Sequence, residues 1–489
     1  MRSSVVPDDK QLDLIDYLYQ HAVDKKETTA LIALTEDDHQ IKLSWNELAD
    51  AVSTASILIE SMFRMETDKP RHVGYLSDNS YGNIILTLAC MNLGLVEFPF
   101  DPRLDETVIE THWSQIKGLW VQLQDFEKQL ITTSSAEKGP SNETTRSAIP
   151  PEHAALVLWT SGTTGEPKGV TLSRKNLLLN ALAKLKAVPQ NSNDRRLCVL
   201  PLCHGYARTC DLGTWLISGC MLAVASGHKG IIKMAPIVKP TLMNVVPRLA
   251  KRLLEDKKID GIDQLRLLGC GGAGLSHQDF NQWQQERGVT VIQGYGLTET
   301  SPVICSASPE NATVGVVGQF VEGWEYKIID QQLYVRGEHL MMGYWNDPEA
   351  TGKKIDPQGW LATGDLVEID TATNQLRILG RADEVVVLDN GYKIHPQTIE
   401  RKINAIGGVK HSMLILRSQL EIWLDLSFDH LRESQKTNVL QDAINQIMRN
   451  TYPSEKYAIK YFSSSLQKNE LTIKGTIRRK QIVRNRLPH

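Results

Sequence analysis

The sequence predicts an α/β fold: a large N-terminal domain of α/β layers that includes a β-rich subdomain, followed by a small α+β C-terminal domain. First, a chain of 489 residues is too long for one ordinary core, so two or more domains are expected. Second, strand-like and helix-like segments alternate to about residue 300, which favours parallel strands covered by helices. Third, the pattern changes to short β-like runs from about residue 314 and to a mixed pattern from about residue 384.

Two helices and a strand-helix-strand unit are expected near the N-terminus. Residues 10–22 and 45–63 have the apolar spacing of helices, and Ser44 with Glu47 three residues later forms a capping-box pattern. The stretch HVGYLSDNSYGNIILTLACMNLGLVEFPF then predicts strand, turn, helix and strand. Residues 132–152 are polar and rich in Ser, Thr and Pro, so a surface connection is expected there.

The C-terminal third is expected to contain the β-rich subdomain and a separate small domain. The runs EYKIID, QLYVRG and QLRILG are short, β-like and bounded by turn residues. The last segment has strand and helix patterns of its own and ends in the basic run KGTIRRKQIVRNR; these patterns lie at residues 385–388, 399–406, 413–416 and 440–448.

Composition and charge exclude several classes of protein. The formal net charge of −3 gives no global attraction to nucleic acid or to an anionic membrane. Seven cysteines without a CxxC pair predict reduced, mostly buried thiols, as in a cytosolic protein, and not a disulfide framework or a zinc site. No apolar run of about 18 residues and no N-terminal apolar leader occurs. We therefore expect a cytoplasmic protein with no nucleic-acid partner and no integral membrane segment.

A loop rich in hydroxyl groups and glycine follows the strand-like run LVLW, in the stretch LVLWTSGTTGEPKGV. It is not a Walker loop, because counting from Gly162 puts Pro167 where the second Gly belongs and Gly169 where the hydroxyl belongs. Most runs of Ser, Thr and Gly are surface turns. Convergent hydroxyl and backbone N–H donors beside a lysine, placed directly after a buried strand, instead predict an anion-binding nest.

This loop closely resembles the phosphate loop of the adenylate-forming superfamily, which contains acyl- and aryl-CoA synthetases, luciferases and peptide-synthetase adenylation domains. Four further segments resemble the family's other motifs, in its order and spacing: LPLCHGYA, GYGLTETSP, GWLATGDL and GRADEVVVLDNGYKIHPQTIE. The resemblance covers nearly the whole chain. Among the members of the superfamily, the sequence is most similar in its motifs to acyl-CoA ligases. One motif could match by chance, but five in order could hardly do so.

The resemblance implies an ATP site. Adenylation brings a carboxylate to the α-phosphate of ATP, and two such anions near 4 Å repel by about 4 kcal/mol at an effective dielectric of 20, so the site must supply cations and donors. Thr298 would contact the α-phosphate, while Glu299, with Thr160, would bind Mg²⁺. The residues that would hold the β- and γ-phosphates are Thr160, Ser161, Gly162, Thr163, Thr164, Gly165 and Lys168.

The resemblance also implies the nucleoside site. Tyr295, between Gly294 and Gly296, would stack on adenine, Asp365 would accept hydrogen bonds from the ribose hydroxyls, and Arg381 would support the same sugar. By residue type alone, Asp365 is an ordinary turn aspartate and Glu299 an ordinary carboxylate at a helix start. The motifs around them indicate function.

A second glycine cluster, GCGGAG at residues 269–274, satisfies the G-x-G-x-x-G pattern after the strand-like LRLL. NAD is excluded because the next strand-like run leads to Gln293 where a dinucleotide site wants an acidic residue. In the family this turn lies against adenine and lines the acyl pocket, which assigns Gly272, Ala273 and Gly274 to the site. A lone histidine is more often structural than catalytic, but the family's histidine at the position of His204 forms the pocket wall, so we assign His204 to positioning the acid.

In the family, one site serves two half-reactions because the small domain rotates. The resemblance therefore implies a domain of residues 1–380 that binds AMP and the acyl group, a mobile domain of residues 384–489, and a hinge near residues 381–383 at Asp383. Rotation would replace the C-terminal lysine loop by the loop containing Gly391, which would border the tunnel for the pantetheine of CoA.

The C-terminal lysine motif departs from the family. The family pattern T-x-x-G-K-I-x-R aligns with TIKGTIRR in this chain. Thr476 therefore occupies the position of the lysine, and Lys474 lies two residues earlier. In an extended loop, side chains two residues apart share a face, so we hypothesise that Lys474 takes the role. Lys474→Ala is expected to cripple adenylate formation while sparing thioester formation from pre-made adenylate. Unchanged adenylate formation would leave Lys480, or no lysine, in this role.

The substrate is expected to be a carboxylic acid without an α-ammonium. Amino-acid-activating domains carry an aspartate in an F-D-x-S context, which HGYARTCDLGTW lacks, and Asp211 is an unfavourable substitute. The segments expected to line the pocket, residues 203–215, 244–247, 270–274 and 293–303, are small-residue and apolar. A fatty or other hydrophobic acid is therefore expected first and an aryl acid second.

CoA is the expected acceptor, and a stand-alone carrier protein remains an alternative because the basic C-terminal run could attract either. A further alternative is a non-catalytic acyl- or nucleotide-binding descendant of the family. The altered lysine motif favours it, whereas the intact loop, Glu299, Asp365 and Arg381 oppose it. Exchange of pyrophosphate into ATP that depends on the acid separates the two.

Overall fold

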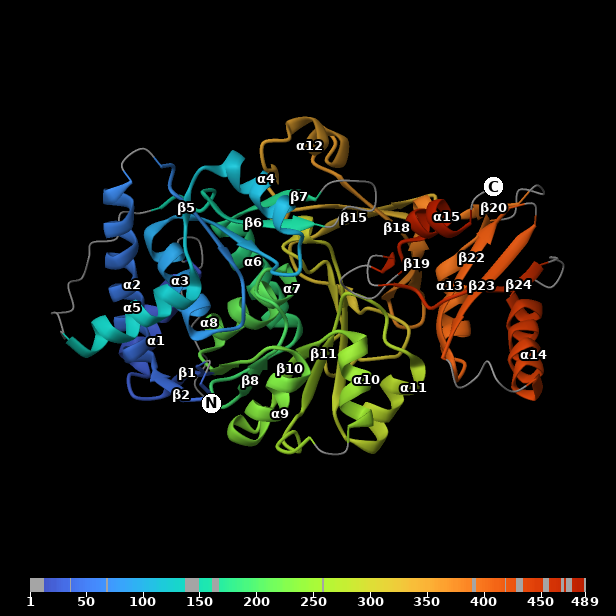
Figure 1. Ribbon diagram of the computed structural model, residues 1–489, viewed down its shortest axis with the longest axis horizontal. Coiled ribbons are helices and arrows are strands. Elements are labelled where there is room, and N and C mark those ends of the chain that lie inside the picture. The colour runs from blue at the N-terminus through green and yellow to red at the C-terminus, as the bar shows by residue number, and fades with distance from the viewer. Residues whose placement is uncertain are drawn as a thin grey trace.

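The computed structural model describes residues 13–35, 37–66, 69–136, 149–160, 167–256, 259–388, 393–417, 419–427, 434–451, 457–467, 470–471 and 477–487. It confirms the predicted α/β fold class, with a large domain of layered sheets and helices and a small C-terminal domain beside it (Figure 1).

A nine-stranded sheet forms one layer of the large domain, in the order β14-β13-β12-β11-β10-β8-β9-β1-β2. The six strands from β12 to β1 are parallel to their neighbours, as the alternating sequence pattern predicted, and the edges are antiparallel. The strands are β1 (Thr29–Leu34), β2 (Gln40–Ser44), β8 (Arg195–Cys198), β9 (Met221–Val224), β10 (Leu242–Val245), β11 (Leu267–Cys270), β12 (Thr290–Tyr295), β13 (Cys305–Ser306) and β14 (Gln319–Phe320). The helices between them are α9 (Gly227–Val238), α10 (Pro247–Glu255) and α11 (His277–Asn281).

A six-stranded sheet forms the second layer, in the order β17-β7-β6-β4-β3-β5. Its strands are β3 (His72–Leu76), β4 (Val96–Phe100), β5 (Leu119–Trp120), β6 (Ala154–Thr160), β7 (Lys168–Ser173) and β17 (Gly343–Tyr344). Helices pack around the two sheets and share one apolar core with them. They are α1 (Leu14–Asp24), α2 (Trp45–Met65), α3 (Tyr81–Leu93), α5 (Leu123–Ala136), α6 (Arg174–Ala187) and α8 (Thr214–Ser218). Helix α4 (Glu106–Ile116) packs in a second apolar cluster, against β4 and β6.

Local sequence signals fixed several of these elements. The Ser44 hydroxyl accepts the Glu47 N–H at 3.3 Å, and the Glu47 carboxylate accepts the Ser44 N–H at 2.8 Å, so the predicted capping box begins α2. The prediction of a connection over residues 132–152 is wrong at its start, because α5 continues through Ala136. The apolar residues Leu123, Phe126 and Leu130 bury this helix against the core, and that burial overrides the polar sequence after them. Residues 137–148 lie outside the described residues.

The β-rich subdomain is a four-stranded antiparallel sheet in the order β15-β16-β18-β19, at the three runs predicted and one more. Its strands are β15 (Glu325–Ile329), β16 (Gln332–Arg336), β18 (Leu361–Asp370) and β19 (Gln375–Arg381). The short helix α12 (Pro348–Lys354) precedes β18 and stands at the upper edge of the molecule in Figure 1. This sheet carries two of the three nucleoside residues expected from the sequence, Asp365 and Arg381.

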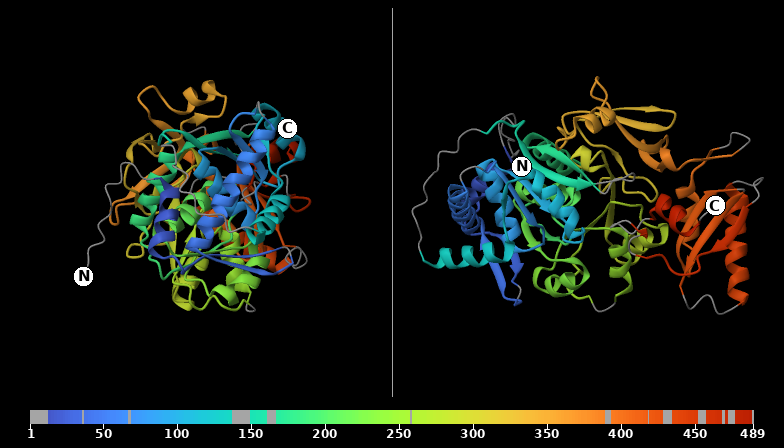
Figure 2. Two further views of the ribbon diagram at one scale, coloured as in Figure 1. Left: turned by 90° about the vertical axis from the view of Figure 1, so that its left-hand side faces the viewer. Right: turned by 45° about the horizontal axis from the view of Figure 1, so that its top comes forward.

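The C-terminal segment has a separate apolar core, between Leu388 and Met448. Its elements are β20 (Val386–Val387), β21 (Lys393–Ile394), α13 (Pro396–Asn404), β22 (Val409–Leu416), β23 (Leu420–Leu426), α14 (Ser434–Thr451), β24 (Tyr457–Tyr461) and α15 (Arg479–Arg486). Figure 2 shows this part beside the large domain, joined to it through the end of β19. The proposed boundary and hinge at residues 381–383 stay predictions.

All seven cysteines are free and buried, in keeping with the sequence. Burial raises the pKa of every one of these thiols, so each is held in its protonated, unreactive form. Within the described ranges, no helix combines the length and the apolar character needed to cross a bilayer.

Candidate active site

The ends of the predicted phosphate loop lie on two paired strands. Thr160 at the end of β6 pairs with Lys168 at the start of β7, and the Thr160 hydroxyl donates to the Lys168 carbonyl at 3.3 Å. The two ends of the loop therefore lie side by side, as a phosphate-binding nest between two paired strands requires. Residues 161–166 lie outside the described residues, so the roles expected of Ser161, Gly162, Thr163, Thr164 and Gly165 stay predictions.

Tyr344 joins the phosphate-loop lysine to the motif carboxylate. Its hydroxyl donates to Glu299 Oε1 at 2.8 Å, and the Lys168 ammonium lies 5.1 Å from the centre of its ring. Burial and the Glu299 charge raise the pKa of Tyr344, so the phenol stays protonated and donates. Glu299 lies on the 3-10 turn Thr298–Thr300, and its carbonyl accepts the Met341 N–H at 2.9 Å. No motif in the sequence pointed to Tyr344, because its contacts depend on β17 pairing with β7.

A second cluster contains the three residues that were expected at the nucleoside site, Asp365, Arg381 and Tyr295. Asp365 on β18 is the register partner of Arg381 on β19, and Arg381 Nη1 donates to Asp365 Oδ1 at 3.1 Å. The Tyr295 hydroxyl donates to Asp365 Oδ2 at 2.5 Å. Gly294 lies on β12 and Gly296 just beyond it; a Cβ at Gly296 would lie 1.6 Å from the Pro302 carbonyl oxygen, so only glycine fits there.

Lys354 is a half-buried cation between the two clusters, and no sequence motif contains it. Its ammonium donates to the Thr363 carbonyl at 3.4 Å, and Arg381 Nη1 donates to the same oxygen at 3.2 Å. Burial lowers the pKa of Lys354, and the surrounding charges that act on this pKa are those of Glu299, Arg381, Asp365 and Lys168. The signal in the sequence is weak: a lysine at the end of a short helix whose neighbour, Lys353, is an ordinary exposed one.

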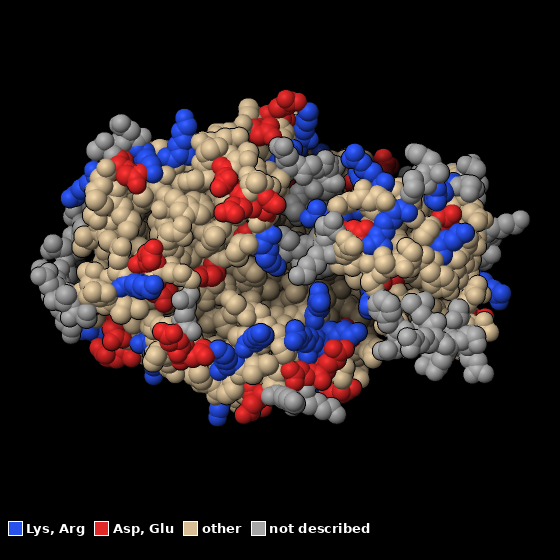
Figure 3. Space-filling view, viewed as in Figure 1, with Lys and Arg blue, Asp and Glu red and all other residues tan. Residues whose placement is uncertain are grey.

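The two clusters together place three cationic side chains and two carboxylates around one region: Lys168, Lys354, Arg381, Glu299 and Asp365. The positive excess suits a polyanion, and a carboxylate beside it suits a hard divalent cation that accompanies phosphate oxygens. On the face drawn in Figure 3, Lys and Arg side chains stand around a hollow near the middle of the molecule.

The described residues contain one grouping of three potential metal ligands, Asp101, Cys203 and His204, whose ligand atoms lie within 4.8 Å of one another. Arg103 already donates to both Asp101 oxygens, at 2.8 and 2.6 Å. Burial raises the pKa of Cys203 to about 12, so its thiol is a poor ligand. This chemistry does not favour a metal here. Glu299, with Thr160 as proposed, is the better match to Mg²⁺.

His204 stands at the entrance of the short helix α7 (Gly205–Ala207), in contact with a charged pair. Its Nε2 lies 3.3 Å from Asp101 Oδ2 and 3.1 Å from Arg103 Nη2. Burial acts to raise the pKa of Asp101, but hydrogen bonds from His204 and Arg103 lower it overall, so the carboxylate stays charged. Asp101 thus fixes the imidazole orientation, which suits the positioning role expected of His204.

The glycine-rich turn after β11 is open to solvent on one side and covered on the other. Gly272, with φ of 82°, Ala273 and Gly274 are exposed. A Cβ at Gly271 would lie 2.9 Å from the ring of Tyr206, so the tyrosine packs directly on the backbone of the turn. On the open side, a Cβ at Gly274 would lie 4.0 Å from the side chain of Arg401 on α13. The turn therefore faces the C-terminal segment.

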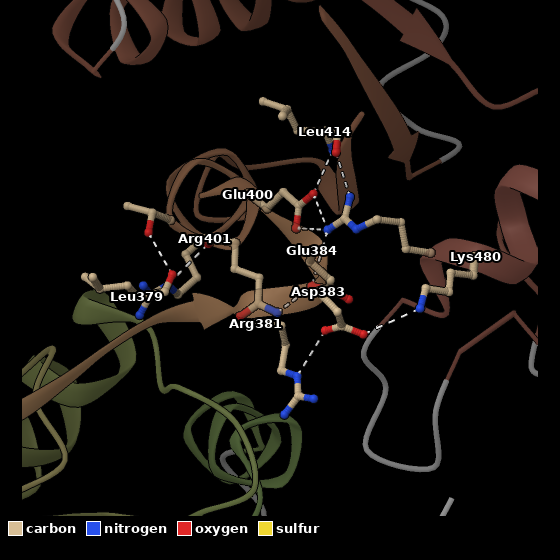
Figure 4. Close-up of polar contacts among 11 residues, drawn as sticks. Leu379, Arg381, Asp383, Glu384, Glu400, Arg401, Leu414 and Lys480 are labelled. Atoms are coloured by element: carbon tan, nitrogen blue, oxygen red, sulfur yellow. Dashed lines mark hydrogen bonds and ion pairs between the residues drawn. The ribbon is translucent and has the colours of Figure 1, made fainter. Parts of the chain in front are cut away.

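The junction to the C-terminal segment is built from charged side chains (Figure 4). Asp383 accepts from Arg381 Nε at 3.4 Å and lies 3.5 Å from Lys480 Nζ, so it connects the end of β19 with α15. Arg401 on α13 donates to the Ile378 carbonyl at 3.1 Å. Asp383 therefore has one charged partner in the large domain and one in the C-terminal segment, which suits a hinge residue. Rotation about it stays a prediction. Gly391 and Lys474 lie outside the described residues.

Three comparisons with known proteins bear on this arrangement. The profile of the AMP-binding enzyme family matches residues 18–345. A 4-coumarate–CoA ligase-like protein of Arabidopsis thaliana is 29% identical over 429 residues, 78% of this chain and 74% of that one. A long-chain-fatty-acid–CoA ligase of Haemophilus influenzae is 30% identical over 285 residues, 54% of this chain and 50% of that one. The second alignment, like several to other CoA ligases, spans about half of the relative's length.

Solved structures share the fold over almost the entire chain. An anthranilate CoA ligase in complex with anthranoyl-AMP superposes with a TM-score of 0.81, 18% identity and coverage of 99% of this chain and 98% of that one. ATP-bound MatB from Rhodopseudomonas palustris superposes with a TM-score of 0.79, 20% identity and coverage of 96% and 98%. At this identity the likeness concerns the fold.

Proposed function

Because the chain belongs to the AMP-binding enzyme family of adenylate-forming acid–CoA ligases, we propose that it joins a carboxylic acid to AMP with release of pyrophosphate. It then transfers the acyl group to a thiol, that of CoA. The observation that carries this proposal is the meeting of Lys168, Glu299, Lys354, Asp365 and Arg381, which come from five separate segments and present the charges that ATP and Mg²⁺ require.

In the first step, a carboxylate oxygen of the acid attacks the α-phosphorus of ATP, and the bond from that phosphorus to the bridging oxygen of the β-phosphate breaks. Lys168 stands where negative charge grows on the departing pyrophosphate, and Asp365 with Arg381 holds the ribose. Bound Mg²⁺ at Glu299 would neutralise phosphate oxygens. These groups lower the repulsion between the acid and the α-phosphate, which is the main barrier to their encounter.

In the second step, a thiolate attacks the acyl carbon of the adenylate, and the bond from that carbon to the AMP oxygen breaks. His204, held by Asp101, and the backbone of the glycine turn border the place where the acid's reacting end would lie. The exposed turn beside Arg401 would let a long thiol-bearing cofactor approach between the two domains. CoA is the proposed acceptor and a stand-alone carrier protein the alternative.

A panel of acids tests the function directly. We expect exchange of labelled pyrophosphate into ATP that depends on a fatty, other hydrophobic or aryl acid, and formation of a thioester when CoA is added. Thioester formation with carrier proteins but not with CoA would select the alternative acceptor. Absence of exchange with every acid would support the non-catalytic binding protein.

Lys354 is expected to act in adenylate formation. Lys354→Met removes a half-buried cation that shares the Thr363 carbonyl with Arg381 and whose charge interacts with those of Glu299 and Asp365. Exchange should therefore fall about 10- to 100-fold, equivalent to about 1.4 to 3 kcal/mol of lost electrostatic stabilisation. The matched control is Lys353→Met on the same helix, where an exposed lysine pairs with Glu349 at 2.6 Å and should lose little.

Comparison of Lys354→Met with Lys474→Ala in the same assay shows which lysine supplies the charge that Thr476 lacks. Loss in the first variant alone assigns this charge to the large domain, so that adenylate formation would not need a lysine from the C-terminal loop. Exchange at the wild-type rate in Lys354→Met would contradict the role of Lys354.

A further inference from the structure

Tyr344 lies between two opposite charges that the proposed reaction uses separately. Its ring centre lies 5.1 Å from the Lys168 ammonium, within the range of a cation–π contact, and its hydroxyl donates to Glu299 Oε1 at 2.8 Å. Within the described part of the chain, neither Lys168 nor Glu299 forms an ion pair with another side chain. The two charges therefore meet the same tyrosine and not each other.

The backbone holds Tyr344 from two directions. Strand β17 pairs with β7, which begins at Lys168, and the N–H of Trp345 donates to the Gly169 carbonyl at 2.7 Å. The Tyr344 N–H donates to the Thr351 hydroxyl on α12 at 2.8 Å. These contacts tie Tyr344 to the strand that carries the phosphate-loop lysine on one side and to α12 on the other.

The carboxylate end of the contact is fixed in a similar way. Glu299 lies on the 3-10 turn Thr298–Thr300, and its carbonyl accepts the N–H of Met341, on the segment that leads into β17, at 2.9 Å. The hydroxyl and the carboxylate are therefore carried by segments that are bonded to each other. Burial and the Glu299 charge raise the pKa of the Tyr344 phenol, so it stays protonated as a donor. The bond engages one oxygen of the carboxylate and leaves the other.

A direct pair between Lys168 and Glu299 would oppose ligand binding. Opposite charges attract more strongly where water is partly excluded, and Glu299 is half-buried. Such a pair would have to break before the ammonium could meet a phosphate or the carboxylate a Mg²⁺ ion. Carboxylates that bind metals are in turn oriented by hydrogen bonds from their neighbours. A neutral ring with one donor contacts both charges and commits neither of them to the other.

We propose that Tyr344 is a positioning residue that keeps Lys168 and Glu299 apart until ATP and Mg²⁺ bind. Its ring holds the ammonium beside the phosphate loop, and its hydroxyl orients the carboxylate so that one oxygen stays open to Mg²⁺. The inference rests on the proposed function and adds to it a residue outside the five sequence motifs. The ring and the hydroxyl have separate tasks, which two substitutions distinguish.

Tyr344→Phe removes the hydroxyl and keeps the ring. The measurement is ATP binding without acid, followed by calorimetry in EDTA and at a series of Mg²⁺ concentrations, so it requires no turnover. In EDTA the variant should bind ATP within about twofold of the wild type, because a ring still holds Lys168. The Mg²⁺ concentration that gives half of the full gain in ATP affinity should rise at least about 10-fold, the usual loss when the partner of a metal-binding carboxylate is removed.

Tyr344→Leu removes the ring and the hydroxyl together. Lys168 and Glu299 can then pair directly, and this pair competes with both ligands. ATP affinity in EDTA should therefore fall about 5-fold, in addition to the weaker response to Mg²⁺. A tyrosine with a purely structural role would instead give two variants with lower unfolding temperatures, each with the same loss of ATP affinity in EDTA and in Mg²⁺.

Tyr334 on β16 supplies the matched control. Its ring centre lies 5.5 Å from the Lys327 ammonium, so it makes the same kind of contact outside the two charged clusters. Tyr334→Phe and Tyr334→Leu repeat both substitutions there. We expect both variants to bind ATP in EDTA, and to respond to Mg²⁺, within about twofold of the wild type, because an exposed contact of this kind is weak and distant from the ligands.

The outcomes separate this inference from the proposed function. A wild-type Mg²⁺ response in Tyr344→Phe, or wild-type ATP affinity in EDTA for Tyr344→Leu, overturns the inference and leaves acid-dependent exchange, and with it the function, standing. A Mg²⁺ response that requires the Tyr344 hydroxyl, in a protein that exchanges pyrophosphate with no acid, supports the inference and overturns the function. A wild-type protein that binds no ATP at any Mg²⁺ concentration overturns both.

Discussion

Asp365→Ala is expected to lower the kcat/KM for ATP in pyrophosphate exchange about 100- to 1000-fold. The substitution removes the carboxylate that receives Tyr295 at 2.5 Å and Arg381 at 3.1 Å, together with the proposed acceptor of the ribose hydroxyls. Hydrogen bonds to a charged group contribute about 1.5 to 3 kcal/mol each, and about 1.4 kcal/mol corresponds to a factor of ten. The loss of two bonds at the lower end of that range, about 3 to 4 kcal/mol in total, gives about 100- to 1000-fold. The measurement is steady-state exchange at varied ATP, with the unfolding temperature of each variant.

The matched control for Asp365 lies on the same strand. Asp370→Ala, at the half-buried far end of β18, removes a carboxylate that receives Arg377 Nη2 at 3.2 Å, and it should change exchange by less than about twofold. Asp365→Asn keeps one acceptor oxygen and should fall between the wild type and Asp365→Ala. An Asp365→Ala variant that exchanges as fast as Asp370→Ala would show that the β18–β19 cluster does not hold the nucleotide.

Glu97→Ala is expected to destabilise the large domain by about 3 to 5 kcal/mol, the usual cost of leaving one partner of a buried ion pair alone. Glu97 on β4 receives Arg208 Nη2 at 2.6 Å and Nη1 at 3.0 Å, and the two side chains are 3% and 1% exposed. The same carboxylate accepts the Thr87 hydroxyl at 2.8 Å. Removing it would leave the Arg208 guanidinium charged and enclosed. Urea unfolding followed by tryptophan fluorescence measures the change.

A surface pair of the same chemistry is the control for Glu97. Arg71 donates to both oxygens of Glu60, at 2.6 and 3.1 Å, but these side chains are 48% and 33% exposed. Glu60→Ala should therefore lower the free energy of unfolding by at most about 1 kcal/mol. Water screens the attraction between the two charges, and it solvates Arg71 when Glu60 is removed. Equal losses in the two variants would show that burial does not set the cost.

Some features of the fold and of the site could be predicted from the sequence, and others could not. The capping box at Ser44 and the strand before the phosphate loop followed from short segments, and the placement of Asp365 and Arg381 in one place followed from a family pattern. Lys354, Tyr344 and Lys184 did not, because each is a common residue type in an ordinary helix or strand. Their significance depends on partners more than 40 residues away, such as Glu299 for Tyr344 (|i−j| of 45) and Ser306 for Lys184 (|i−j| of 122).

The sequence by itself determined the elements and the order of the motifs, because caps, apolar periodicity and glycine-rich turns depend on forces between residues close in the chain. It also determined that the protein is an α/β member of the adenylate-forming superfamily. Only the tertiary structure decided which charges share a region: it brought Lys354 and Arg381 to the same Thr363 carbonyl, beside Asp365, and it set the buried Lys184 ammonium against the Ser306 hydroxyl. Electrostatic free energy depends on the distance between charges in space and on their burial. Neither quantity follows from the number of residues that separate the charges in the chain.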